Sequence, residues 1–148
     1  MAREALLELR CVGGSKDIVC LIESLCDAGW TVFNSNGKIE YLPFGDDEDF
    51  CWCEDVITED ELKKIISSKQ NNNELCGVNL FYRGTDHGVS LLARNIEEVM
   101  VSISINRKTI SEGNDALSDV EWYFSKIIKV LHEDTSLQIS YKFEDYID

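Results

Sequence analysis

The most regular pattern in the sequence is an alternation of apolar and polar residues over eight positions, from Val99 to Asn106. One set consists of β-branched residues, namely Val99, Val101, Ile103 and Ile105. The other set consists of Met100, Ser102, Ser104 and Asn106. A period of two residues is typical of a strand with one buried face. Such a strand needs a sheet around it and a layer of other elements against its apolar side.

Several other segments share this period or are rich in residues that favour strands. They are Ala5–Cys11, Thr31–Phe33, Ile39–Leu42, Leu75–Tyr82, Val89–Ala93 and Leu137–Phe143. Asn36-Gly37 lies between the second and third of these segments. Because this dipeptide suits a two-residue turn, the sequence predicts a hairpin there.

Three segments instead place apolar residues three and four positions apart, as in a helix with one buried face. The first follows a possible Ser15 cap and ends before Gly29. The second is short and follows a capping box at Thr58–Glu61. The third is the most regular, and it begins with a capping box at Ser118–Glu121.

Strands and helices are therefore mixed, with hairpins more frequent than crossover connections. We expect an α+β fold: a largely antiparallel sheet, two main helices (the first and third) packed on one face, and one short extra helix. No linker-like change of composition and no internal repeat interrupts the chain. Residues 1–148 are expected to form a single acidic domain.

The charge balance limits the partners that this chain can bind. Hydrophobic residues make up 44% of the sequence, which is too many for a disordered acidic tail. The formal net charge is −14. A folded body with that charge repels phosphate backbones and anionic lipid surfaces, so we expect no direct binding to nucleic acid or membranes. A basic protein is the complementary partner.

The first ten residues include two glutamates where a secretory signal would need an uninterrupted apolar stretch. No apolar run is long enough to span a bilayer. These features predict a cytoplasmic protein, in which the six cysteines stay reduced and most serve as small core residues.

The segment Asp46–Glu61 holds nine carboxylates in sixteen residues, with no lysine or arginine. Close like charges repel, so folding gains nothing from gathering them, whereas a basic partner would be attracted. Glu59, Asp60 and Glu61 have a structural explanation, because acids in the first turn of a helix interact well with its dipole. The simpler interpretation of the rest is a solvated acidic loop.

The functional interpretation is a partner-binding surface in which carboxylates steer the encounter and two aromatic residues anchor the complex. Its candidate residues are Asp46, Asp47, Glu48, Asp49, Phe50, Trp52, Glu54 and Asp55. In an extended segment from Phe50 to Cys53, the two aromatic residues would share one face and Cys51 and Cys53 the other. We therefore expect one of these pairs to be buried and the other exposed.

Metal sites fit the sequence poorly. Cys51 and Cys53 are one residue apart, closer than the usual pair in a structural zinc site, although His87 and His132 could supply nitrogen ligands. Calcium loops of the EF-hand type need a glycine and a glutamate at fixed positions after the first aspartate, and both are missing downstream of Asp46. Weak calcium binding stays open, but we expect no resident metal or cofactor.

Catalytic motifs are also missing. Asp86 and His87 lie near Ser90, but the first two are adjacent in an apparent turn, where their side chains diverge. No nucleophile elbow, phosphate-binding loop or dinucleotide fingerprint occurs. A contiguous acidic run is also unlike the pocket of a glycosidase or nuclease. The sequence predicts a protein that is not an enzyme.

Six short segments together resemble bacterial immunity proteins of contact-dependent growth inhibition and related polymorphic toxin systems. They are Trp30–Phe33, Tyr41–Asp47, Phe50–Trp52, Gly77–Gly88, Asn106–Lys108 and Asp119–Tyr123. The resemblance spans about residues 30 to 131. It implies a small cytosolic protein that binds the toxic C-terminal domain of its cognate effector, often a nuclease, and blocks its active site or substrate surface.

The charge argument agrees with this resemblance, because a nuclease needs a basic face to attract phosphates. Two other classes stay open. An acidic mimic of nucleic acid, or another protein-binding module, would use the same charge on different partners. A small hydrolase would need a pocket that the sequence does not reveal. The oligomeric state does not follow from the sequence.

Overall fold

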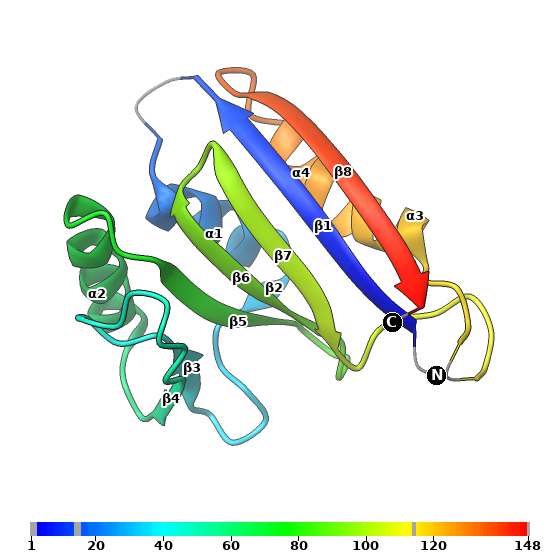
Figure 1. Ribbon diagram of the computed structural model, residues 1–148, viewed down its shortest axis with the longest axis horizontal. Helices are drawn as coiled ribbons and strands as arrows, with labels where there is room; N and C mark the ends of the chain where they lie inside the picture. Colours follow the sequence, from blue (N-terminus) through cyan, green and yellow to red (C-terminus); the bar gives the residue numbers. More distant parts are fainter. Residues whose placement is uncertain (1–2, 14–15, 114, 148) are drawn as a thin grey trace.

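In the computed structural model, which describes residues 3–13, 16–113 and 115–147, eight strands form one antiparallel sheet (Figure 1). Seven of them lie side by side in the order β4-β3-β5-β6-β7-β1-β8, and β2 pairs with β5 outside this path. The strands are β1 (Arg3–Val12), β2 (Trp30–Thr31), β3 (Ile39–Tyr41), β4 (Cys53–Asp55), β5 (Cys76–Tyr82), β6 (Gly88–Asn95), β7 (Glu98–Ile105) and β8 (Gln138–Ile147).

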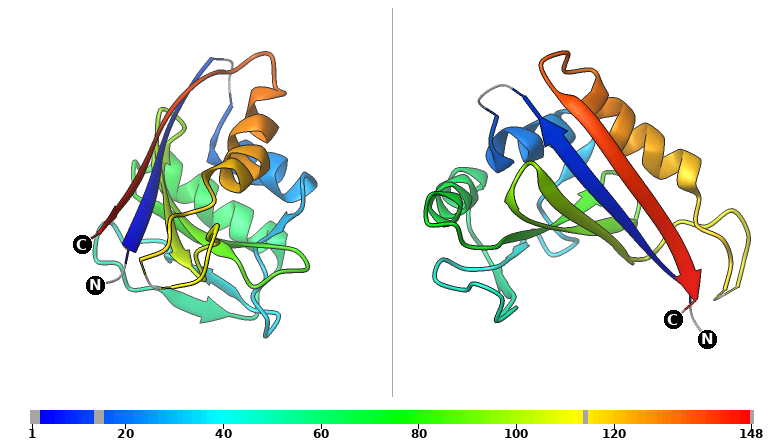
Figure 2. Two further views of the ribbon diagram at one scale, coloured as in Figure 1. Left: turned by 90° about the vertical axis from the view of Figure 1, so that its right-hand side faces the viewer. Right: turned by 45° about the horizontal axis from the view of Figure 1, so that its top comes forward.

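The helices pack on one face of this sheet and leave the other face open (Figures 1 and 2). Helix α1 spans Ile18–Asp27 and α2 spans Glu59–Asn71. The third helical segment runs from α3 (Val120–Tyr123) through a π-helical turn, η1 (Phe124–Ile128), into α4 (Lys129–His132). The α+β class and the antiparallel sheet are as predicted. The expected division into two main helices and a short one does not match, because α2 has 13 residues and α1 has 10.

The alternation of the strands decides which side chains enter the core. Val99, Val101 and Ile103 of β7 are buried, whereas Met100 between them is exposed on the open face. In β1, the four apolar residues from Ala5 to Cys11 at alternate positions are buried in the same cluster. The apolar residues at alternate positions in the sequence therefore identify the face of the sheet that the helices cover.

Helix α1 begins differently from the prediction. Ser15, the expected cap, lies outside the described residues, and the N-cap is Asp17, whose Oδ1 accepts the backbone N–H of Cys20 at 2.8 Å. Gly29 follows the helix with a φ of +116°, as its expected place after the end requires.

The caps of the other two helices give a mixed result. Thr58 caps α2 as predicted, since its Oγ1 accepts the N–H of Glu61 at 3.1 Å. The third segment is capped by Asp119 and not by Ser118, because Asp119 Oδ1 accepts the N–H of Trp122 at 3.1 Å. Ser118 is buried instead, and its N–H donates to Asp145 of β8.

The expected hairpin at Asn36-Gly37 has a longer connection than a two-residue turn, closed by hydrogen bonds from the Asn34 N–H to the Lys38 carbonyl oxygen (2.8 Å) and from the Gly37 N–H to the Asn34 carbonyl oxygen (3.0 Å). The Asn34 side chain stabilises this turn, because its Oδ1 accepts the N–H groups of both Asn36 and Lys38. Between the two arms the structure describes one isolated bridge, Phe33 to Ile39. β3 pairs mainly with β4, a strand that the sequence analysis did not include.

Candidate protein-binding surface

The acidic loop, residues 43–52, joins β3 to β4 and is held against α2 by a buried lysine. The Lys69 side chain has no exposed area, and its Nζ donates to the carbonyl oxygens of Pro43 (2.7 Å) and Asp46 (2.6 Å). A third acceptor, Glu74 Oε1, lies 3.3 Å away. A buried ammonium is costly unless its three donors are satisfied, and here three acceptors surround it. The start of the loop is therefore fixed to the end of α2.

Asp46 fixes the turn of the acidic loop from inside. Its side chain is buried, with Oδ1 accepting the N–H groups of Asp49 (2.9 Å) and Phe50 (3.1 Å) and Oδ2 that of Cys51 (2.7 Å). Glu48 and Phe50 have positive φ angles of 75° and 54°, which bend the backbone around this carboxylate. Although Asp46 was a candidate for partner contact, its carboxylate is turned inward and shapes the loop.

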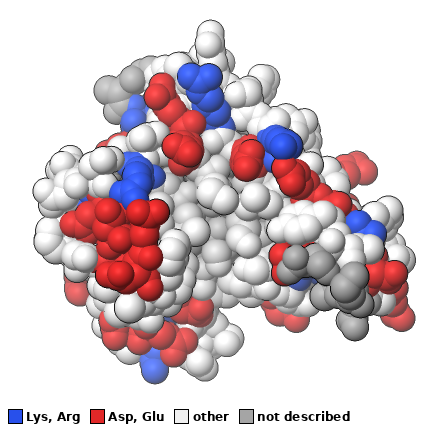
Figure 3. Space-filling view, in the orientation of Figure 1, with Lys and Arg blue, Asp and Glu red and all other residues white. Residues whose placement is uncertain are grey.

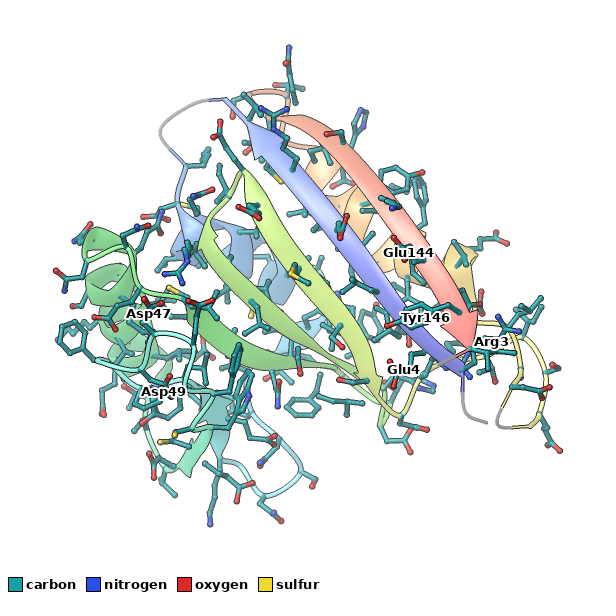
Figure 4. The ribbon with its side chains drawn as sticks, in the orientation of Figure 1. Arg3, Glu4, Asp47, Asp49, Glu144 and Tyr146 are labelled. Carbon is teal, nitrogen blue, oxygen red and sulfur yellow. The ribbon has the colours of Figure 1, made fainter. Side chains whose placement is uncertain are left out.

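Asp47 and Glu48 are exposed, but one arginine pairs with both. Arg94 on β6 places Nη1 2.6 Å from Asp47 Oδ1 and Nη2 3.2 Å from Glu48 Oε2. Asp47 Oδ1 also accepts the Leu75 N–H. The Leu75 N–H and then the Arg94 guanidinium lower the pKa of Asp47 below its ordinary value. Figure 3 shows the acidic patch with basic atoms beside it, and Figure 4 shows where Asp47 and Asp49 lie within it.

The two aromatic residues of the acidic loop both face solvent. Phe50 is 49% exposed and Trp52 is 38% exposed. Cys51 is exposed and Cys53 is half-buried, so neither predicted pair is fully buried. The reason is that the left-handed backbone of Phe50 breaks the extended conformation on which that expectation rested. Exposed aromatic side chains within a charged surface are typical of protein interfaces.

Glu54 and Asp55 continue the acidic surface along β4, at one edge of the sheet. Glu54 accepts a hydrogen bond from Asn34 Nδ2 at 2.6 Å and lies 4.0 Å from Lys38 Nζ. Asp55 accepts the Tyr41 hydroxyl at 2.8 Å. Burial and this hydrogen bond raise the pKa of Tyr41 to about 12. Both carboxylates are exposed and in fixed positions.

Sequence reasoning missed three residues of this surface: Lys69, Arg94 and Phe44. Lys69 follows Leu62 and Ile66 at spacings of four and three, so the helical period places it on the buried face of α2. That spacing is a signal that could have identified it. Phe44 is the most exposed aromatic side chain of the acidic loop, and nothing in the local pattern distinguishes it from a core residue.

The alternative sites are not assembled in the described residues. His87 Nδ1 lies 2.6 Å from the Asn106 carbonyl oxygen, while the Ser90 hydroxyl donates to Asn79, so each has its own partner. All six cysteines are free thiols, with Cys11 and Cys76 buried. Among the described residues, no three histidine, cysteine or acidic side chains are grouped so that they could hold a metal ion.

The open face of the sheet contains a shallow groove of about 500 Å³. Leu6, Leu92 and Met100 form part of its floor. At its end the Tyr146 hydroxyl lies 3.2 Å from Glu4 Oε2 (Figure 4). In Figure 3 the centre of this face is uncharged, with acidic side chains on either side. Of the described residues that line the groove, the charged ones are Arg3, Glu4 and Arg107, and none belongs to the acidic loop.

Comparisons with protein-family models, with curated proteins and with solved structures find no match for this chain. Within the described part of the chain, every helix is too short or too polar to cross a bilayer.

Proposed function

We propose that this chain is an immunity protein that binds and neutralises the toxic C-terminal domain of a cognate bacterial effector. The partner is a basic domain, expected to be a nuclease, and the chain occludes its active site or substrate surface. One observation supports this proposal above the others: Phe50 and Trp52 are exposed on an acidic loop whose backbone is fixed by buried Asp46 and Lys69.

A fixed loop suits tight binding because little conformational freedom is lost when the complex forms. Aromatic side chains in the centre of an interface supply most of its energy, whereas exposed charges mainly raise the association rate. Phe50 and Trp52 are the anchors in this proposal, with Phe44 beside them. Asp49 and Glu54 contribute to the steering field.

The contact surface differs from the predicted one in the role of Asp46. The other seven candidate residues have exposed positions, while Asp46 acts through the loop that it shapes. Arg94 compensates part of the charge of Asp47 and Glu48. The net attraction of this surface for a basic partner is therefore weaker than its six carboxylates suggest. The lower net charge favours binding to one partner whose surface is complementary in shape. A general mimic of nucleic acid would need carboxylates that no arginine compensates.

Occlusion needs no catalytic residue, metal or cofactor, and we propose that the protein is not an enzyme. Because a nuclease acts on nucleic acid inside the cell, we also place its inhibitor in the cytoplasm. The binding face would combine the acidic loop with β4, at one end of the sheet.

Coexpression with the C-terminal domain encoded by the nearest upstream large effector gene tests the proposal. The expected result is that cells survive and that the two proteins co-purify. The Phe50→Ala/Trp52→Ala double variant should lose protection while keeping its circular dichroism spectrum and melting temperature. Ile110→Ala, which also truncates an exposed apolar side chain, is the matched control and should protect fully. Killing despite folded wild-type protein would refute the proposal.

A further inference from the structure

The two edges of the sheet are built very differently. At one edge, β4 is three residues long and carries two carboxylates, Glu54 and Asp55. Short, charged edge strands resist pairing with other chains. At the other edge, β8 is ten residues long and pairs with β1 from end to end. In the described residues β1 is its one strand partner, so β8 is the outermost strand and its outer side is not paired with another strand (Figure 2).

An apolar strip runs along this open edge on the helix side. Tyr141 of β8 is 49% exposed, and its ring lies 5.7 Å from that of Phe124, which is 40% exposed. Val120 continues the strip on α3. Together with Phe143 these residues line a cleft of about 290 Å³ whose surface is almost entirely apolar. Neither proline nor glycine interrupts β8. The edge carries charges at Lys142, Glu144 and Asp145, but it has neither the short length of β4 nor a break that would prevent strand pairing.

The charges of β8 complement those of a second, antiparallel β8. Lys142 and Glu144 lie on the open-face side of the strand, and their charged groups are 2.7 Å apart. If a two-fold axis passes through Phe143, Lys142 of each copy lies opposite Glu144 of the other. Centring the axis on Lys142 or on Glu144 would place like charges opposite each other. Centring it on Tyr141 would place both charges opposite uncharged residues.

The register centred on Phe143 also uses most of the strand, pairing residues 139–147 of one copy with 147–139 of the other. Opposite charges directly across an antiparallel pair are stabilising, and like charges are destabilising. In this register four charges alternate in sign around the axis. The exposed rings of Tyr141 and Phe124 from the two copies then cover the apolar strip on the helix side.

We propose that β8 pairs antiparallel with β8 of a second copy of this chain, which extends the sheet across a two-fold axis centred on Phe143. The strand order places the acidic loops at the far ends of the resulting dimer. Their mutual repulsion is therefore small at physiological ionic strength, where charges more than about 8 Å apart are screened. Both acidic loops also stay accessible, so the dimer does not depend on the proposed toxin binding.

Charge reversal on β8 tests the pairing through sedimentation velocity over a range of protein concentrations. The wild-type chain, of 16.8 kDa, should sediment with twice that mass at high concentration. Lys142→Glu and Glu144→Lys should each weaken the dimer, on the order of tenfold, because each places two pairs of like charges across the axis. The double variant restores opposite pairs and should dimerise like wild type.

The two single variants change the net charge in opposite directions. If general repulsion controlled association, Glu144→Lys would strengthen the dimer, whereas the β8 register requires both variants to weaken it. Lys64→Glu on α2 is the control, because Lys64 is also exposed and its reversal should leave the dimer unchanged. The Lys142 side chain is 65% exposed and that of Glu144 is 42% exposed, and the circular dichroism spectrum of each variant checks that folding is preserved. A wild-type mass of one chain up to about 1 mM, or a double variant that stays as weak as the single ones, would overturn the proposal.

Discussion

Replacing the buried Lys69 by methionine should destabilise the whole protein and release the acidic loop. Methionine has a similar length, so the aliphatic contacts of the stem are largely kept. The change removes three donors and leaves the Pro43 and Asp46 carbonyl oxygens without the ammonium group. Glu74 keeps the hydrogen bond from the Gly45 N–H but loses its buried cation.

The expected loss can be worked from these contacts. Hydrogen bonds that involve a charged group each contribute about 1.5 to 3 kcal/mol. Two short bonds, at 2.7 and 2.6 Å, therefore give a loss of free energy of unfolding of about 3 kcal/mol or more for Lys69→Met. For a domain of this size, that loss lowers the melting temperature by about 6 to 12 °C.

Urea denaturation followed by circular dichroism measures the free energy of unfolding. Lys64→Met, on the exposed side of the same helix, is the control and should change it by less than about 0.5 kcal/mol. If Lys69→Met lowers the free energy of unfolding by less than about 1 kcal/mol, the hydrogen bonds of Lys69 do not stabilise the acidic loop as proposed.

Three further results are expected. Asp46→Asn should lower the free energy of unfolding by about 1 to 3 kcal/mol, because the amide has one acceptor oxygen where the carboxylate uses two to accept three backbone N–H groups. An unchanged midpoint in urea denaturation would contradict this. Burial raises the pKa of the Cys26 and Cys76 thiols to about 11, so peptide mapping after brief alkylation at pH 8 should find exposed Cys51 modified first. A neighbouring backbone N–H and then an arginine lower the pKa of Asp47. The ionised Asp47 carboxylate therefore stabilises the folded protein above pH 3.8, and this stabilisation is lost as the pH falls through the lowered pKa of the folded state. An NMR titration of the Asp47 carboxyl group with a midpoint at or above pH 3.8 would refute this.

Much of the fold could be predicted because burial on one face leaves a period in the sequence. The alternation in β7 and β1 identified both strands and their buried sides. β4 was missed because it has three residues and two carboxylates, too short for a period and too polar for a strand. The π-helical turn was not predicted either. The Trp30 indole N–H donates to the Lys126 carbonyl oxygen within that turn.

The candidate surface was predicted in location but not in detail. The density of acids identified the segment, whereas the inward orientation of Asp46 depends on positive φ angles at Glu48 and Phe50. The pairing of Arg94 with two acids joins residues more than forty positions apart, which a local pattern does not reveal. Alternation likewise could not decide between the Phe50 and Cys51 faces, because the segment is not extended.

The central claim is that Phe50 and Trp52, on a fixed acidic loop, anchor a basic toxin domain. Isothermal titration calorimetry with the purified, catalytically inactivated toxin domain tests it most directly. Losing two interface anchors at about 2 kcal/mol each predicts a dissociation constant roughly 1,000-fold larger for Phe50→Ala/Trp52→Ala than for wild type, with unchanged affinity for Ile110→Ala. A double variant that binds within about threefold of wild type would contradict the claim and place the interface elsewhere.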